Sequence, residues 1–236
     1  MLQNSELQKI FNSLDITVDE KLLKTALTHS SVTFENSEEE NYERLEFLGD
    51  SVLKLTMSDI LYKKYPDYEE GRMTKIRGIL IADSVLAKLG KKNEINKLII
   101  VGSNEKKDHG QDKDSVIACV MEAIFGAIYL SCGIEKAMNY IKYLYDNLIE
   151  EVDDHLDIYN AKAVLQEYTQ GLHKDLPEYI LIEEKGKAHN KTFYYEIVYH
   201  GEVLAKGSGK TKRDAQQDAA KAACLRLGIF EENINE

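Results

Sequence analysis

Three carboxylates stand at helical spacing between residues 41 and 55. On a helix that advances about 100° per residue, Glu43, Glu46 and Asp50 lie within an arc of about 60°. Apolar side chains occupy the opposite side of this helix, and Arg44 is the cation that we place near the acids. Carboxylates this close together repel one another and resist burial, and hard divalent cations such as Mg²⁺ prefer oxygen ligands. The stripe therefore indicates either a solvated acidic face or a site for a divalent cation.

A fourth carboxylate, Glu122, is the only charged residue in the apolar run from residue 115 to residue 133. An unpaired buried carboxylate costs several kcal/mol, so Glu122 requires a partner. That partner is either an arginine, with Arg44 and Arg77 as candidates, or a metal ion shared with the acids of the stripe. The run approaches the length of a membrane span, but its internal polar residues and the lack of a second such run favour a buried helix of a globular domain.

The elements that must position these acids are mostly helical. Helical periodicity extends from residue 7 to about residue 148, and the helix of the acidic stripe is expected to end before Pro66. Residues 150–157 are strongly acidic, which is typical of a short linker or of the end of the preceding helix. The pattern then changes to a helix, three strands and a long Ala-rich helix. We expect these elements at residues 161–170, 179–184, 193–200, 203–209 and 212–227.

Two blocks of sequence resemble one known family. The block Glu43-Arg-Leu-Glu-Phe-Leu-Gly-Asp-Ser-Val-Leu53 resembles, without a gap, the signature of bacterial ribonuclease III. The blocks Leu165–Tyr168, Gly186–Phe193 and Gly207–Arg213 resemble the double-stranded-RNA-binding domain that follows the nuclease in this family. The resemblance implies an all-α endonuclease domain at residues 1–150, a linker at 151–158, a small α+β (α-β-β-β-α) double-stranded-RNA-binding domain at 159–228, and a C-terminal tail at 229–236.

The resemblance also implies an activity. Members of this family are cytoplasmic homodimeric endoribonucleases that cleave double-stranded RNA by metal-dependent hydrolysis, and they process rRNA precursors and structured mRNA. The expected products carry 5′-phosphate and 3′-hydroxyl ends with two-nucleotide 3′ overhangs, and the expected cofactor is Mg²⁺, with Mn²⁺ as an alternative. Carboxylate-held metal ions suit this reaction because they activate water and neutralise charge at the phosphate. No membrane partner is expected.

The family resemblance assigns roles to individual acids. The residues Glu122-Ala-Ile-Phe-Gly-Ala-Ile-Tyr129 resemble the second catalytic block of the family. By this resemblance the catalytic, metal-binding residues are Glu46, Asp50 and Glu122, of which Asp50 helps to position or activate the water. Glu43 and Glu70 correspond to accessory acids of the catalytic valley, and Phe47 is a candidate anchor of the homodimer interface. His29 is expected to be a structural histidine.

One position departs from the family pattern. An aspartate that ligates metal normally stands three residues before the Glu122 position, and here that residue is Cys119. A thiol is a soft ligand that is largely protonated near neutral pH, so it matches Mg²⁺ poorly. Three interpretations follow. The protein cleaves RNA with a weakened site, it is catalytically impaired and only binds double-stranded RNA, or Cys119 is a ligand that favours a softer metal.

The RNA-binding residues are likewise assigned by resemblance. A domain of this kind reads the shape of about 16 base pairs through two minor grooves and the phosphates between them. Gln166 and Gln170 would contact one minor groove, and His189 the next. Basic side chains at a helix N-terminus suit the intervening phosphates, and the residues in this position are Lys210, Lys212 and Arg213. In the first domain, Thr74, Lys75 and Arg77 stand where family members contact phosphate.

Composition narrows the function class further. The net charge of −11 is unusual for a nucleic-acid binder, but residues 159–228 hold 11 Lys and Arg against 9 Asp and Glu. The three cysteines, Cys119, Cys132 and Cys224, lack CxxC spacing, which favours reduced thiols over a disulfide framework or a zinc site. No secretory signal is evident at the N-terminus. A remaining alternative is an acidic helical adaptor joined to an RNA-binding domain, which predicts no metal dependence.

Overall fold

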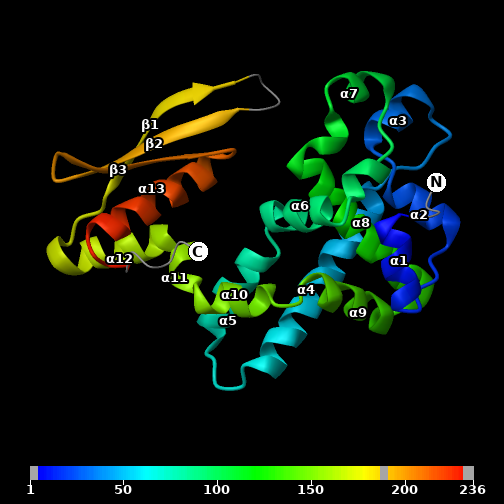
Figure 1. Ribbon diagram of the computed structural model, residues 1–236, viewed down its shortest axis with the longest axis horizontal. Helices are drawn as coiled ribbons and strands as arrows, with labels where there is room; N and C mark the ends of the chain where they lie inside the picture. Colours follow the sequence, from blue (N-terminus) through cyan, green and yellow to red (C-terminus); the bar gives the residue numbers. More distant parts are fainter. Residues whose placement is uncertain (1–4, 187–190, 231–236) are drawn as a thin grey trace. The chain divides into compact units, whose positions relative to one another are not determined.

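The computed structural model describes residues 5–186 and 191–230. The chain divides into two compact units, Met1–Asp153 and Asp154–Glu236, and each is described by itself. The first unit is helical in the described residues (Figure 1). Its α-helices are α1 (Glu6–Ser13), α2 (Glu20–Ala26), α3 (Ser30–Glu35), α4 (Glu43–Lys64), α5 (Glu70–Leu80), α6 (Asp83–Lys92), α7 (Ser103–Lys107), α8 (Asp114–Cys132), α9 (Ile134–Leu144) and α10 (Leu148–Asp154). Two 3₁₀ turns, η1 (Ile95–Leu98) and η2 (Gly110–Asp112), lie between α6 and α8.

Helix α8 forms the centre of the first unit. It contacts α2, α4, α6 and α9, and most of its side chains between Val116 and Ile128 are buried. By length and composition α8 could cross a membrane, but 61% of its most apolar window is buried inside the domain. The prediction of a buried core helix is confirmed.

Helices α4 and α8 pack so closely that the backbone of one helix contacts the backbone of the other. A Cβ atom on Gly49 would lie 1.7 Å from the carbonyl oxygen of Glu122, and a Cβ atom on Gly126 would lie 2.4 Å from that of Leu45. No side chain fits at such distances, so glycine is required on both helices. This contact places the acidic stripe of α4 against the middle of α8. Helix α4 ends at Lys64 with Tyr65 as its C-cap, as Pro66 predicts.

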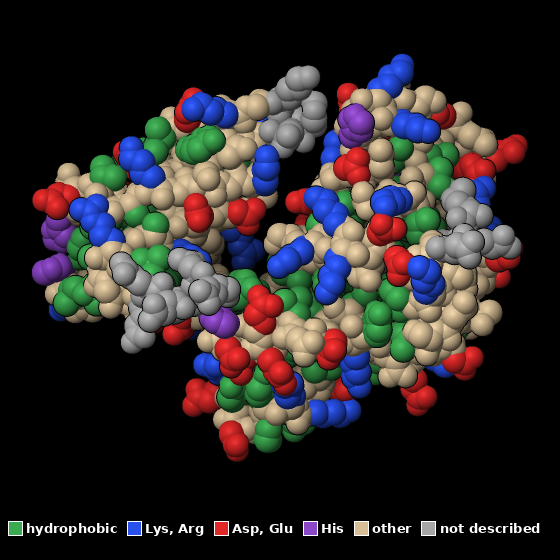
Figure 2. Space-filling view, in the orientation of Figure 1, with side chains coloured by type: hydrophobic (Ala, Val, Ile, Leu, Met, Phe, Trp, Pro, Cys, Tyr) green, Lys and Arg blue, Asp and Glu red, His purple; other side chains and the backbone are tan. Residues whose placement is uncertain are grey.

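The acidic segment after residue 148 is helical and partly tied to α5. Figure 2 shows acidic side chains gathered over α10. One of these acids, Asp153, accepts hydrogen bonds from Arg72 at 2.6 Å and from the Tyr68 hydroxyl at 2.8 Å. The side chain of Asp153 is only 10% exposed. Part of the segment expected to be a linker is therefore anchored helix.

The second unit has the predicted helix–strand–strand–strand–helix order. Its elements are α11 (Leu156–Tyr159), α12 (Ala161–His173), β1 (Glu178–Lys185), β2 (Thr192–Tyr199), β3 (Glu202–Gly209) and α13 (Lys212–Arg226). The sheet is antiparallel in the order β1-β2-β3. His200 (φ 51°) and Gly201 (φ 78°) form the tight turn between β2 and β3, because both central residues of such a hairpin turn need positive φ.

The core of the second unit lies between one face of the sheet and the helices α12 and α13 (Figure 1). Leu165 of α12 and Ile197 of β2 are fully buried there. Helix α13 approaches β3 closely, since a Cβ atom on Gly207 would lie 2.1 Å from the backbone nitrogen of Ala219. The Ala-rich face of α13 and the glycines of β3 thus fit each other, because neither carries a large side chain.

We expect Gly49→Ala to destabilise the protein by more than about 3 kcal/mol, because the added methyl group overlaps backbone atoms of α8. Chemical denaturation of the full chain measures this loss. Gly78→Ala is the matched control in α5, where a Cβ atom meets nothing within 4 Å. It should be neutral or should stabilise the protein by up to about 1 kcal/mol. Equal stabilities of the two variants would contradict the close helix contact.

Candidate functional site

The carboxylates of α4 and α8 form one charged region around Glu122. Burial raises the pKa of Glu122 to about 8, with the charges of Asp50, Glu46 and Asp83 as further causes and Lys54 as an opposing one. In the described parts of the chain, no ion pair joins Glu122 to Arg44 or Arg77. The Arg77 side chain instead donates to the Ser58 hydroxyl at 2.8 Å. A protonated carboxyl or a bound cation is therefore what relieves the charge at Glu122.

Cys119 lies within this acidic region. Burial raises the pKa of its thiol to about 12, and the carboxylates of Glu46 and Glu122 add to the shift. Burial and the neighbouring Cys119 in turn raise the pKa of Tyr42. The position at which the resembled family carries an aspartate thus holds a neutral, hydrogen-bonding thiol rather than a thiolate.

Asp50 has a direct cationic partner on its own helix. Lys54 Nζ donates to Asp50 Oδ2 at 2.7 Å, one helical turn further along α4. Sequence reasoning placed only Arg44 near the stripe and missed Lys54. The signal was present, because a lysine four residues after an aspartate is the spacing that favours a helical ion pair.

Asp83, the first residue of α6, is a further acid of this region. Its charge acts on both Cys119 and Glu122. Lys91, near the end of α6, pairs with Asp114 at the start of α8, and Gly90 lies against Ile117 and Met121. Helix α6 therefore runs antiparallel to α8. No sequence motif includes Asp83, so only the tertiary structure reveals it.

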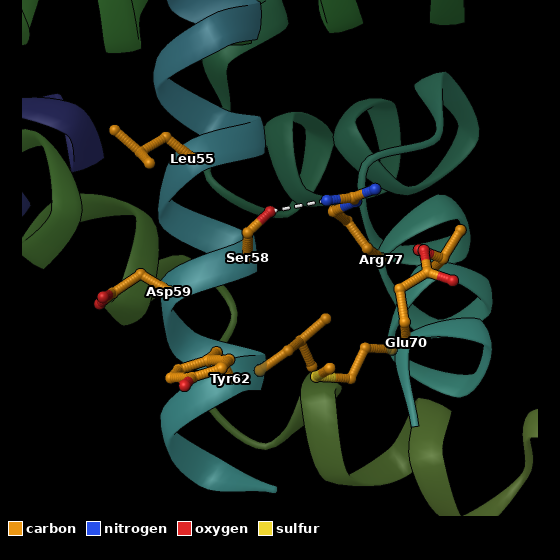
Figure 3. Close-up of a pocket in the computed structure, with 9 residues that line it drawn as sticks. Leu55, Ser58, Asp59, Tyr62, Glu70 and Arg77 are labelled. Carbon is orange, nitrogen blue, oxygen red and sulfur yellow. Dashed lines mark hydrogen bonds between the residues drawn. The ribbon is translucent and has the colours of Figure 1, made fainter. Parts of the chain in front are cut away.

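The two predicted accessory acids, Glu43 and Glu70, are not among the acids that act on Glu122. Glu43 begins α4 and is exposed. Glu70 begins α5 and accepts a hydrogen bond from the Thr74 hydroxyl at 2.7 Å. Glu70, Thr74 and Arg77 line a pocket of about 390 Å³ between α4 and α5 (Figure 3). Within one chain, Glu70 therefore belongs to this pocket, which begins at Leu55, beyond Asp50 on α4.

The donor set around Glu122 suits a hard divalent cation by its chemistry. Glu46 and Asp50 are half-buried on α4, and with Glu122 they offer carboxylate oxygens, the ligands that Mg²⁺ and Mn²⁺ prefer. The ligand types therefore fit the cation. In the described parts of the chain, no three His, Cys, Asp or Glu side chains are already close enough together to hold a metal ion.

The structure also shows the surroundings of His29 and Phe47, two further residues considered in the sequence. His29 caps α3, where its Nδ1 accepts from the Ser31 backbone N–H at 3.1 Å, and its ring meets the edge of the Tyr42 ring. Burial lowers the pKa of His29. These contacts are those of a packed histidine, in agreement with the prediction. Phe47 lies on the outside of α4 and is 80% exposed.

The predicted RNA-binding residues of the second unit lie on its surface. Gln166 and Gln170 are exposed one turn apart on α12, and Lys212 and Arg213 are exposed at the first turn of α13. Thr211 caps this helix by accepting from the Asp214 backbone N–H at 3.1 Å. Lys210, at the end of β3, donates to the Thr192 hydroxyl at 3.3 Å. His189 lies outside the described residues, and Lys75 is exposed on α5.

We expect Glu122→Gln to stabilise the metal-free protein at alkaline pH. The folded state holds the Glu122 proton up to about pH 8, whereas the unfolded state releases it near pH 4.5. Stability contributed by this proton is thus complete below about pH 4.5 and is lost as the pH rises towards 8. Glutamine stays neutral, so the variant should gain about 1–3 kcal/mol at pH 8, after allowance for solvent screening.

Chemical denaturation in EDTA at several pH values between about 5 and 8 measures this effect. Glu135→Gln, which removes an exposed acid of α9, is the control. The difference between the two variants should grow with pH, and parallel pH profiles would contradict the crowding of charge at Glu122.

In comparisons with known proteins, each of the two units matches a known family. Residues 19–148 match the family described as Ribonuclease-III-like, and residues 161–227 match the double-stranded RNA binding motif. Ribonuclease 3 of Natranaerobius thermophilus is 37% identical over 223 residues, covering 94% of this chain and 96% of the relative. Ribonuclease 3 of Listeria monocytogenes is 40% identical over 209 residues, covering 88% and 91%.

A solved structure supports the same assignment. The nuclease domain of ribonuclease III from Campylobacter jejuni superposes with a TM-score of 0.54 at 36% identity, covering 61% of this chain and 96% of that one. Two family models match successive parts of this chain, and the alignments with the relatives cover most of both proteins. This chain belongs to the ribonuclease III family of endoribonucleases, with a double-stranded-RNA-binding motif in its second unit.

Proposed function

We propose that this protein hydrolyses phosphodiester bonds of double-stranded RNA with the help of Mg²⁺, or alternatively Mn²⁺. One observation carries the proposal: the contact of Gly49 with α8 brings Glu46 and Asp50 of α4 near enough to Glu122 of α8 for their charges to act on its carboxyl group. Membership of the ribonuclease III family supports the reaction type.

The proposed roles follow from the chemistry of phosphodiester hydrolysis. A divalent cation, when bound, supplies an activated water and neutralises charge on the phosphate. Glu46, Asp50 and Glu122 would hold it, and Asp50 would orient the attacking water. Glu43 and Glu70 would add negative potential to the catalytic valley. Release of the 3′ oxygen leaves a 3′-hydroxyl and a 5′-phosphate, and two sites offset across a duplex leave two-nucleotide 3′ overhangs.

Such paired sites require a homodimer, which we propose forms through α4. Phe47, Leu55 and Tyr62 of this helix are 80%, 58% and 73% exposed. Exposed aromatic and aliphatic residues on one helix are typical of a surface that a partner covers. The name of the Campylobacter jejuni structure compared above refers to a region involved in dimer formation of that nuclease domain. A monomeric full-length chain in solution would contradict the dimer.

A second candidate function rests on Cys119. Its raised thiol pKa leaves the site one negative charge short of the family pattern, which favours a catalytically impaired protein that only binds double-stranded RNA. We propose the active enzyme in preference, because three carboxylates remain around Glu122.

We further propose the domain boundaries 1–150 and 159–228, rRNA precursors and structured mRNA as substrates, and the cytoplasm as the place of action.

Cleavage of a long, perfectly paired RNA tests the proposal. We expect short duplex products in Mg²⁺, a loss of at least about a hundredfold for Glu122→Gln, and a several-fold gain for Cys119→Asp, which restores a hard ligand. The matched control is Cys132→Asp, since Cys132 lies at the end of α8. Tight RNA binding without cleavage in Mg²⁺ and Mn²⁺ would instead support the impaired protein, and unchanged cleavage by Cys119→Asp would show that the thiol does not weaken the site.

The RNA interface has a separate test. We expect Lys212→Ala combined with Arg213→Ala to weaken duplex binding and to reduce the slope of log K against log salt by about two, since each phosphate contact contributes about 0.9. The control combines Lys174→Ala with Lys206→Ala, which removes the same charge from the end of α12 and from β3. Titrations at several salt concentrations measure the slopes, and equal slopes for the two double variants would refute the assignment.

A further inference from the structure

Lys54 continues the acidic stripe of α4. It stands four residues after Asp50 and eight after Glu46, so the three side chains project from the same side of the helix. Its Nζ donates to Asp50 Oδ2 at 2.7 Å, and the two side chains are 54% and 35% exposed. The ammonium group therefore lies on one of the proposed metal ligands, at the edge of the site.

Lys54 is also the cation that acts on the rest of the site. Its positive charge opposes the crowding of negative charge at Glu122. Within residues 5–186 and 191–230, no other Lys, Arg or His lies within ion-pair distance of Glu43, Glu46, Asp50 or Glu122. Arg44, which follows Glu43 directly in the sequence, acts on Glu40.

We propose that Lys54 is a positioning residue that holds Asp50 in the metal-free site and must release it before a divalent cation binds. Lys54 is thus a built-in competitor of the metal, and it raises the metal concentration that the enzyme requires. This inference rests on the metal site of the proposed function.

Electrostatic repulsion favours the exchange. Mg²⁺ binds a carboxylate oxygen at about 2.0–2.1 Å, so an ammonium group hydrogen-bonded to the same oxygen of Asp50 would lie within about 5 Å of a double positive charge. The lysine stem is flexible and the ammonium group is strongly hydrated. Since the side chain is half exposed, Lys54 can turn into water at little cost.

The same helix provides an internal reference. Lys63 donates to Asp59 at 2.9 Å, with the same four-residue spacing and a nearest contact of 2.7 Å between Nζ and the other carboxylate oxygen. Asp59 lines the pocket between α4 and α5 and is not among the acids that act on Glu122. If Lys54 formed only an ordinary surface ion pair, removing either lysine would have the same small effect.

Metal titration of the full-length chain without RNA tests the proposal. Free Mn²⁺ is measured by electron paramagnetic resonance at constant ionic strength, and MgCl₂ is added as a competitor. We expect Lys54→Met to bind both ions about three- to tenfold more tightly than the unaltered protein. Lys63→Met should stay within about twofold of it, and Lys54→Arg, which keeps the charge, should resemble the unaltered protein.

Thermal denaturation provides a second readout. In EDTA, Lys54→Met should lower Tm more than Lys63→Met does, because Asp50, Glu46 and Glu122 lose their counter-charge, and added MnCl₂ should close the difference. Unchanged or weaker metal binding by Lys54→Met would overturn the role of Lys54 alone. Absence of metal binding in every variant, with Cys119→Asp included, would overturn the proposed metal site and this inference together.

Discussion

The backbone contact between α4 and α8 is the constraint on which the rest of the first unit depends. Gly49 and Gly126 let the two helices approach until only hydrogen atoms fit between them. At that distance the negative charges of Glu46 and Asp50 on α4 act on Glu122 of α8, even though like charges repel one another. The surrounding apolar helices fix this arrangement, since α8 is buried on most sides. The packing of the helix backbones, rather than attraction between the side chains, therefore brings the acids together.

Three features of this chain reduce that crowding. Glu122 retains its proton up to about pH 8, Cys119 contributes a neutral thiol in place of a carboxylate, and Lys54 supplies a positive charge at Asp50. All three act in the same direction, since each makes the metal-free site less negative. A less negative site is more stable alone and attracts a cation less strongly. At the proposed metal site, stability of the free protein and affinity for the cation are thus opposed in the same few residues.

Much of the fold could be predicted because its signals are local. The stripe of Glu43, Glu46 and Asp50 needs only helical periodicity, and the turn at His200 and Gly201 needs only turn chemistry. The anchoring of α10 by Arg72 and Asp153 could not be predicted, since the partners are far apart in sequence and meet only through packing of whole helices.

The candidate site shows the same division. Glu122 was predictable as a lone charge in an apolar run, but its pairing with an arginine or a metal could not be decided without the position of α4. Asp83 belongs to no motif and acts on the site only because α6 lies antiparallel to α8. Lys54 was visible in the sequence at the favourable spacing from Asp50, so missing it was an error of interpretation rather than a limit of the sequence.

The contact between Gly49 and α8 has a consequence for biosynthesis. The two helices are far apart in sequence, so the first can form while the second has not yet been translated. A nascent chain that ends before Glu122 carries Glu46 and Asp50 without their acidic partner on α8. Because the contact joins segments that are distant in the chain, the acids can be brought together only after residue 122 has been translated.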